Sequence, residues 1–138
     1  MVEINNLTTV KGINEEFLKK VAEKVLEEEK KEKKDLSIAF VGQGRIRELN
    51  KRYRGKNKVT DILAFPGGET GLGEIVICLR EVKKNAKKFD SIFQKELIKV
   101  LIHGVLHLLG YDHEKSEQKA EKMREKEEYY LSKFKIQN

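Results

Sequence analysis

All three histidines of this 138-residue chain lie in the stretch 103–113, which reads HGVLHLLGYDH. If the stretch begins as a helix, His103 and His107 share one face, with Cβ atoms about 5–6 Å apart. Both imidazoles can then bind one metal ion at about 2.0–2.1 Å. Gly110 stands where such a helix would end, and glycine accepts the left-handed conformation that turns a chain back. His113 can therefore face the first two histidines, and the spacing predicts a metal site with three histidine ligands.

Neutral imidazole groups suit zinc, copper, iron and nickel. Zinc is the first choice, because three protein ligands with a fourth position left to water are typical of a catalytic zinc site. No thiolate or carboxylate ligand offsets the charge of the ion, so its bound water should ionise near neutral pH. We therefore expect one Zn²⁺ held by three histidines plus water, and metal-assisted hydrolysis as the chemistry. Nickel and iron remain alternatives.

The spacing H-x-x-x-H-x-x-G-x-x-H matches that of the metzincin proteases, with one departure. Gly104 occupies the position at which those enzymes carry a glutamate general base. Without that carboxylate, peptide hydrolysis lacks its proton acceptor, so the glycine argues against peptides as substrates. Asp112 and Glu114 flank His113 and are candidate acceptors for imidazole N–H groups, with solvated turn residues as the alternative.

The whole stretch HGVLHLLGYDH resembles the signature of the YbeY family, which are zinc-dependent endoribonucleases of ribosomal RNA maturation. Three upstream blocks are also similar to those of the family and follow in its usual order: 49–55 (LNKRYRG), 60–66 (TDILAFP) and 73–77 (GEIVI). This chain departs from the common pattern at Val59, Ala64 and Glu74, where the family often has proline, serine and aspartate.

The resemblance implies that His103, His107 and His113 are the zinc ligands and that Arg54 is a catalytic residue. It also implies an α+β fold, in which helices pack against a small mixed β-sheet of about four strands, with the zinc at one end of a cleft. We expect a single domain over residues 1–138, long enough to bury about two-thirds of the surface of its unfolded chain.

The hydrophobic pattern predicts the elements that position these residues. The expected strands are 2–4 at an edge, 36–41, 59–65 and 74–79. The expected helices follow caps at Asn14 and Ser116 and also cover 45–53, 82–89 and 92–109. In the helix 45–53, Ile46, Leu49 and Tyr53 should point inward. The charged run 27–34 is interpreted as a solvated helix end and loop.

The helix 92–109 is apolar on nearly every side, so it should be the buried centre of the domain. Either Asp90 or Ser91 is expected to cap it. A helix packed all round would hold His103 and His107 rigidly, and its apolar surroundings would strengthen the effect of the metal's charge.

Basic residues outnumber acidic ones by 29 to 23, which gives a net charge of +6 and a moderate bias toward polyanions. The positive charge is densest on the helix 45–53 and the loop after it, where Glu48 is the only acid. A phosphate-binding surface and a merely solvated helix face are the two interpretations, and we favour RNA binding. The candidate RNA-binding residues are Arg45, Arg47, Arg52, Lys56 and Lys58.

The sequence favours a cytoplasmic protein. Its single cysteine, Cys78, lies in an apolar run and can form no internal disulfide. Residues 1–6 show neither the basic region nor the apolar region of a secretory signal. The longest apolar run, 97–109, is too short to span a bilayer, so no membrane partner is expected.

We therefore expect a zinc-dependent endoribonuclease that cuts single-stranded RNA, with 16S ribosomal RNA or the small ribosomal subunit as its partner. One alternative is a metzincin-like metallopeptidase, which Gly104 and the basic surface disfavour. The other is a non-catalytic RNA-binding assembly factor with a structural zinc, which a set of only three protein ligands disfavours.

Overall fold

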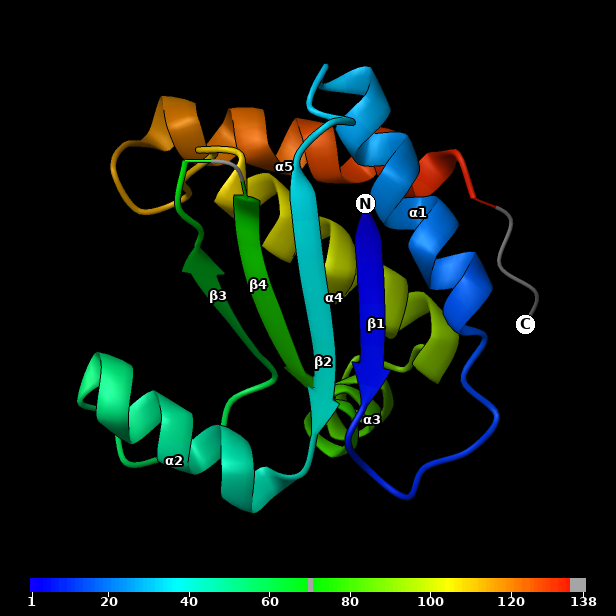
Figure 1. Ribbon diagram of the computed structural model, residues 1–138, viewed down its shortest axis with the longest axis vertical. Coiled ribbons are helices and arrows are strands. Elements are labelled where there is room, and N and C mark those ends of the chain that lie inside the picture. The colour runs from blue at the N-terminus through cyan, green and yellow to red at the C-terminus, as the bar shows by residue number, and fades with distance from the viewer. Residues whose placement is uncertain (70, 135–138) are drawn as a thin grey trace.

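Figure 1 shows the computed structural model of the chain, which describes residues 1–69 and 71–134. The described residues form four strands and five helices, which confirms the expected α+β class. The elements in chain order are β1 (Val2–Asn6), α1 (Glu15–Glu28), β2 (Asp35–Val41), α2 (Gln43–Arg54), β3 (Ile62–Pro66), β4 (Gly71–Cys78), α3 (Leu79–Lys88), α4 (Phe93–Leu108) and α5 (Glu117–Ser132).

The four strands form one mixed sheet with the order β1-β2-β4-β3. β1 and β4 both run parallel to β2, whereas β3 is antiparallel to β4. Parallel neighbours need a long crossover, which α1 provides between β1 and β2. The first strand is therefore at one edge, as expected, and β3 is at the other edge, beside the last turns of α4.

Alternating side chains give the sheet an apolar surface on each face. On one face, the side chains of β2 and β4 pack with α1, α4 and α5 into the main core, and Figure 1 shows α4 crossing behind the sheet. On the other face, a smaller core lies under α2. The buried strand residues of the main core are Val2, Leu36, Ile38, Phe40, Ile75 and Ile77, and the smaller core consists of Val41, Ile46, Leu63, Val76 and Cys78.

Most of α4 is buried, but its last turn is not. The residues from Glu96 to Leu106 supply its buried side, whereas His103 is half-buried and His107 is exposed. The expectation of a helix packed all round is therefore wrong at the histidines, because this end of α4 borders a cleft. Among the described residues, no helix is both long and apolar enough to cross a membrane.

Two of the three expected helix caps are confirmed. The side chains of Asn14 and Ser116 each accept a hydrogen bond at 3.1 Å from a backbone N–H in the first turn of α1 and α5. The N-cap of α4 is instead Ile92, which has no side-chain acceptor. Asp90 adopts a positive φ of 53°, and Ser91 donates its N–H back to α3, so both belong to the turn that closes α3.

The helix α2 begins at Gln43, directly after β2, rather than at Arg45. Tyr53 was expected inside but is 61% exposed, and Asn50 is buried in its place. The side-chain amide of Asn50 donates to the carbonyl oxygen of Lys58 at 3.0 Å, so it fastens the loop that follows α2. A polar residue was missed as a core position because its partner is a backbone group rather than an apolar side chain.

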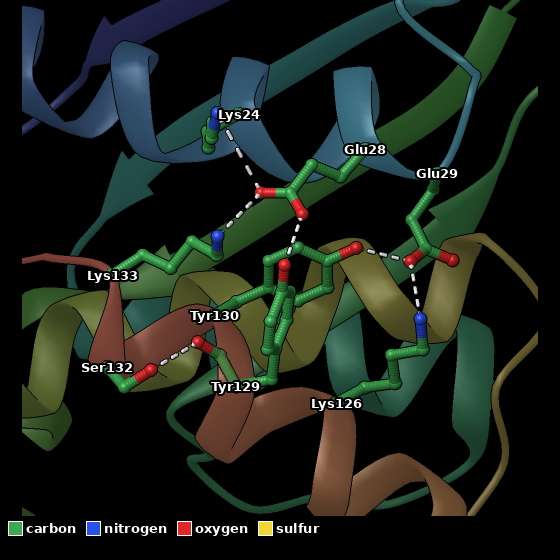
Figure 2. Close-up of polar contacts among 8 residues, drawn as sticks. All are labelled: Lys24, Glu28, Glu29, Lys126, Tyr129, Tyr130, Ser132 and Lys133. Atoms are coloured by element: carbon green, nitrogen blue, oxygen red, sulfur yellow. Dashed lines mark hydrogen bonds and ion pairs between the residues drawn. The ribbon is translucent and has the colours of Figure 1, made fainter.

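The charged run 27–34 departs from the expected solvated helix end at Glu28 and Glu29. Figure 2 shows that both carboxylates reach side chains of α5. Glu28 accepts a hydrogen bond from the hydroxyl of Tyr129 at 2.6 Å, and Glu29 accepts one from the hydroxyl of Tyr130. These two glutamates therefore join α1 to α5.

Candidate active site

One cleft of about 610 Å³ contains all three histidines together with Arg54. It lies between the end of α2, strand β3, the last turns of α4 and the turn that follows α4. The fold thus brings the three expected metal ligands close to Arg54, although Arg54 and His113 are 59 positions apart in the sequence (113 − 54). The lining residues are Tyr53, Arg54, Thr60 to Phe65, His103, Gly104, His107, Asp112, His113 and Glu114.

The turn after α4 directs His113 back toward the helix. Gly110 has a φ of 102°, and its N–H donates to the carbonyl of His107 at 3.1 Å. The N–H of Tyr111 donates to the carbonyl of Leu106, also at 3.1 Å. This pair of bonds is the Schellman arrangement that ends many helices. The rings of His103 and His113 have centroids 5.3 Å apart, so the turn predicted at Gly110 is confirmed.

Glu127 on α5 contacts His103, the least exposed of the three histidines. Its Oε1 atom lies 2.7 Å from Nδ1 of His103. A carboxylate in this position fixes the orientation of the ring and leaves Nε2 free of this contact. Glu127 was not among the residues expected in the site. The available signal was a carboxylate within the apolar stripe of α5, between the buried residues Met123 and Tyr130.

Gly104 is required by the close approach of α4 to the sheet. A Cβ atom at this position would lie 2.7 Å from Cδ1 of Ile62 and 3.2 Å from Cδ1 of Ile75. A glutamate here, as in the metzincins, would have to displace the ends of these two side chains. Packing between α4 and the sheet therefore disfavours a large side chain at position 104.

Asp112 and Glu114 both line the cleft, and of the two interpretations left open by the sequence the contacts favour turn residues. Asp112 accepts the backbone N–H of Glu114 at 2.7 Å, and this hydrogen bond lowers the pKa of the Asp112 carboxyl. Glu114 lies 3.9 Å from Nε2 of His113, which is beyond hydrogen-bond distance. Asp112 therefore shapes the turn around His113, and the imidazole acceptor of the cleft is Glu127.

The three imidazole groups are suitable ligands for a metal ion, although they do not point to one common position. Among residues 1–69 and 71–134, no group of three or more His, Cys, Asp or Glu side chains is arranged so that it could hold a metal ion. His107 and His113 are both exposed, so their rings can rotate without disturbing the core. The metal site therefore stays a prediction.

The five expected RNA-binding residues lie outside the cleft, on α2 and the loop after it. All five are exposed. Glu48 pairs with Arg45 at 3.2 Å and with Arg52 at 3.6 Å, and Arg47 donates to the side chain of Asn57 at 2.9 Å. Lys56 and Lys58 stand in the loop that Asn50 fastens. The surface therefore leads along α2 to Arg54 at the rim of the cleft.

Comparison with known proteins agrees with this geometry. A family model described as "Endoribonuclease YbeY" matches residues 3–135. The chain belongs to the Endoribonuclease YbeY family. A YbeY endoribonuclease of Thermodesulfovibrio yellowstonii is 49% identical over 106 residues, which cover 72% of this chain and 67% of the relative. One from Thermotoga neapolitana is 43% identical and covers 87% of this chain and 82% of the relative.

A similar fold is also known from experiment. The solution structure of a Thermotoga maritima protein matches with a TM-score of 0.71 at 36% identity. The match covers 96% of this chain and 87% of that protein. Membership of the YbeY family confirms the resemblance found in the sequence and the expectation of an enzyme of the hydrolytic nuclease class.

Proposed function

We propose that the chain is a zinc-dependent endoribonuclease that cuts single-stranded RNA, with ribosomal RNA of the small subunit as its substrate. The observation that carries the proposal is the meeting of His103, His107 and His113 with Arg54 in one cleft. Family membership supports RNA as the class of substrate. The proposed setting is the cytoplasm, in agreement with a buried, unpaired Cys78.

Three imidazoles are the proposed ligands, and zinc when bound would supply positive charge for the phosphate and activate a water molecule. Glu127 would keep His103 in the tautomer whose Nε2 is free to bind the ion. The Schellman turn at Gly110 would hold His113 opposite that ring. Packing of Gly104 on Ile62 would set how closely α4, and so both of its histidines, approaches β3.

Arg54 is the proposed phosphate-binding group of the reaction. It is exposed at the last residue of α2 and lines the same cleft as the histidines. A guanidinium is permanently charged and can donate two parallel hydrogen bonds to phosphoryl oxygens. Placed there, it would offset the negative charge that builds up as the phosphodiester is attacked.

Two aromatic rings offer a reason for a preference for single strands. Tyr53 and Phe65 line the cleft, and their rings lie edge to face with centroids 5.3 Å apart. Tyr53 is largely exposed, so an unpaired base can stack on it, whereas a paired base is held within its helix.

The proposed path of the RNA backbone is the basic surface of α2 and its loop. If Arg47 and Lys56 contact phosphates, the logarithm of RNA affinity should fall with the logarithm of salt concentration by about 0.7 per contact. Changing both residues to glutamine should weaken binding to all RNA sequences alike and flatten this slope. Unchanged affinity and slope would move the path to another surface.

A cleavage assay separates the proposed function from its rivals. Purified protein is incubated with unstructured RNA, with small-subunit ribosomal RNA and with casein, each with and without a chelator. We expect internal cuts in both RNAs, loss of cutting with chelator, recovery with added zinc, and intact casein. Cleavage of casein would favour a peptidase. RNA binding without any cleavage in the presence of zinc would favour an assembly factor.

A further inference from the structure

The turn that carries His113 contacts a largely buried carboxylate that the proposed reaction does not use. Glu29 directly follows α1, and its side chain is only 12% exposed. Its Oε1 atom accepts a hydrogen bond from the hydroxyl of Tyr111 at 2.7 Å. Tyr111 is two residues before His113, although Glu29 is 82 residues away in the sequence. The contact therefore ties the end of α1 to the histidine turn.

The other oxygen of Glu29 is fixed by α5. It accepts hydrogen bonds from the hydroxyl of Tyr130 and from Nζ of Lys126, the latter at 3.1 Å. Figure 2 shows both side chains pointing to this carboxylate. Glu29 thus has three donors on two oxygens, so it cannot move without breaking contacts to both α5 and the turn.

The chain around His113 is held on both sides of the histidine. Before it, the N–H groups of Gly110 and Tyr111 bond to carbonyls of α4, and the Tyr111 hydroxyl bonds to Glu29. A further bond spans the histidine, because the N–H of Glu114 donates to the side chain of Asp112. His113 itself is exposed and has no hydrogen bond within the described part of the chain. Its position therefore depends on the anchoring of its neighbours.

We propose that Glu29 is a positioning residue for His113. Glu29 acts on the turn through its hydrogen bond with the hydroxyl of Tyr111. The proposal rests on the proposed role of His113 as a metal ligand. The carboxylate restrains the turn, so that the imidazole of His113 stays close to those of His103 and His107 on α4. Without this contact, the hydrogen bonds that hold the turn would be its own backbone bonds and the one from the N–H of Glu114 to Asp112.

The charge of Glu29 suits this role. Burial alone would raise its pKa, but the hydrogen bonds from Tyr130, Tyr111 and Lys126 outweigh burial, and the pKa is lowered. The group is therefore ionised at neutral pH, and hydrogen bonds to a charged acceptor are about twice as strong as neutral ones. A glutamine at position 29 would lose this charge, and its amide nitrogen would face a donor instead of accepting from it.

The neighbouring Glu28 is a matched control for a purely structural role. It also joins α1 to α5, through the hydroxyl of Tyr129 at 2.6 Å and Nζ of Lys133 at 3.7 Å. Figure 2 shows that each carboxylate has its own set of partners. Glu28 has no contact with the turn among its described partners. If Glu29 only held the helices together, replacing either glutamate would have the same consequences.

The test compares Glu29→Gln and Tyr111→Phe with Glu28→Gln in the full chain. The first readout is amide hydrogen exchange of Gly110 and Tyr111 in metal-free protein. We expect exchange to become about ten-fold faster in Glu29→Gln and in Tyr111→Phe, because a hydrogen bond to a charged group is lost. In Glu28→Gln it should stay within about two-fold of wild type.

The second readout is zinc affinity, measured by competition with a coloured chelator. We expect a loss of about ten-fold in Glu29→Gln and in Tyr111→Phe, with little further loss in the double variant, because both remove the same bond. Tyr111→Phe keeps the ring, so it answers the question even if Glu29→Gln folds poorly. Unchanged exchange, or unchanged zinc affinity despite a loosened turn, would overturn the proposal. A wild-type protein that binds no zinc would instead contradict the proposed zinc chemistry, and amide exchange alone would then decide whether Glu29 braces the turn.

Discussion

Oε1 of Glu127 lies 2.7 Å from Nδ1 of His103, across the contact between α5 and α4. An ionised carboxylate can only accept a hydrogen bond, so this pair places the proton on Nδ1. The lone pair on Nε2 is then free to bind a metal ion. A contact between two helices thus selects the tautomer of a side chain in the cleft.

Glu127→Ala should weaken zinc binding by about 10–100-fold, because His103 loses the group that orients it. Glu127→Gln should lose less, because its amide oxygen can still accept from Nδ1. Glu128→Ala, at an exposed neighbour on the same helix, should bind zinc like wild type. Titration with a competing chelator measures all three, and equal affinity in Glu127→Ala and Glu128→Ala would exclude Glu127 from the site.

Gly104→Ala should destabilise the protein by about 1–3 kcal/mol, because the added methyl group meets Ile62 and Ile75 in a packed core. Gly44→Ala is the control, because a Cβ atom there meets nothing within 4 Å. That change should be neutral or stabilise α2 by up to about 1 kcal/mol. Urea unfolding of the two variants gives the comparison, and equal stabilities would show that position 104 has room for a side chain.

Acid should weaken the contact between α1 and α5. The pKa of Glu29 in the folded protein lies below its ordinary value of 4.5, so the folded state binds this proton less tightly than the unfolded state does. The resulting stabilisation is complete well above pH 4.5 and is lost as the pH falls through the lowered pKa. As the pH falls from 5, the free energy of unfolding should therefore decrease less in Glu29→Gln than in wild type, because the variant has no carboxylate to protonate at this position. Urea unfolding at a series of pH values measures the difference.

The matched control for that pH series is Glu23→Gln, at an exposed carboxylate of the same helix. Its unfolding free energy should follow the wild-type pH dependence. If Glu29→Gln and wild type lose stability in parallel as the pH falls, the bonds from Tyr111, Tyr130 and Lys126 do not hold Glu29 ionised in solution.

Arg54→Ala should keep the zinc affinity of wild type and cut RNA more slowly, by a factor on the order of 10²–10³, because the guanidinium is proposed to act on phosphate and not on the metal. Arg54→Lys should restore only part of the rate, since a point charge cannot make the planar two-bond contact. Arg52→Ala, two positions earlier and outside the cleft lining, should affect binding more than the rate of cleavage. Wild-type turnover in Arg54→Ala would remove Arg54 from the mechanism.

Local signals in the sequence predicted much of this structure. Asn14 and Ser116 cap helices through atoms only three residues away, so their effect is readable from the chain itself. The spacing from His103 to His113, with Gly110 between, likewise encodes a helix and a turn. The predicted turn and the class of fold are therefore confirmed, although the metal is untested.

The parts that sequence reasoning missed depend on contacts between distant elements. Glu127 meets His103 only because α5 packs on α4, and Glu29 meets Tyr111 only because α1 ends beside the turn. In the sequence, both glutamates stand in highly charged stretches, where a carboxylate is usually solvated. The prediction that Tyr53 points inward was wrong for a related reason. This residue of an amphipathic helix lines a cleft, where its aromatic ring stays exposed.

The most direct test of the account is a titration of metal-free protein with zinc, in which bound zinc and RNA cleavage are measured in the same samples. We expect both to rise together and to saturate at about one equivalent of zinc, as three ligands and one open position require. His107→Ala should stay folded, because this side chain is exposed, and should lose both zinc binding and cleavage. RNA cleavage at the wild-type rate by metal-free protein or by His107→Ala would contradict the account.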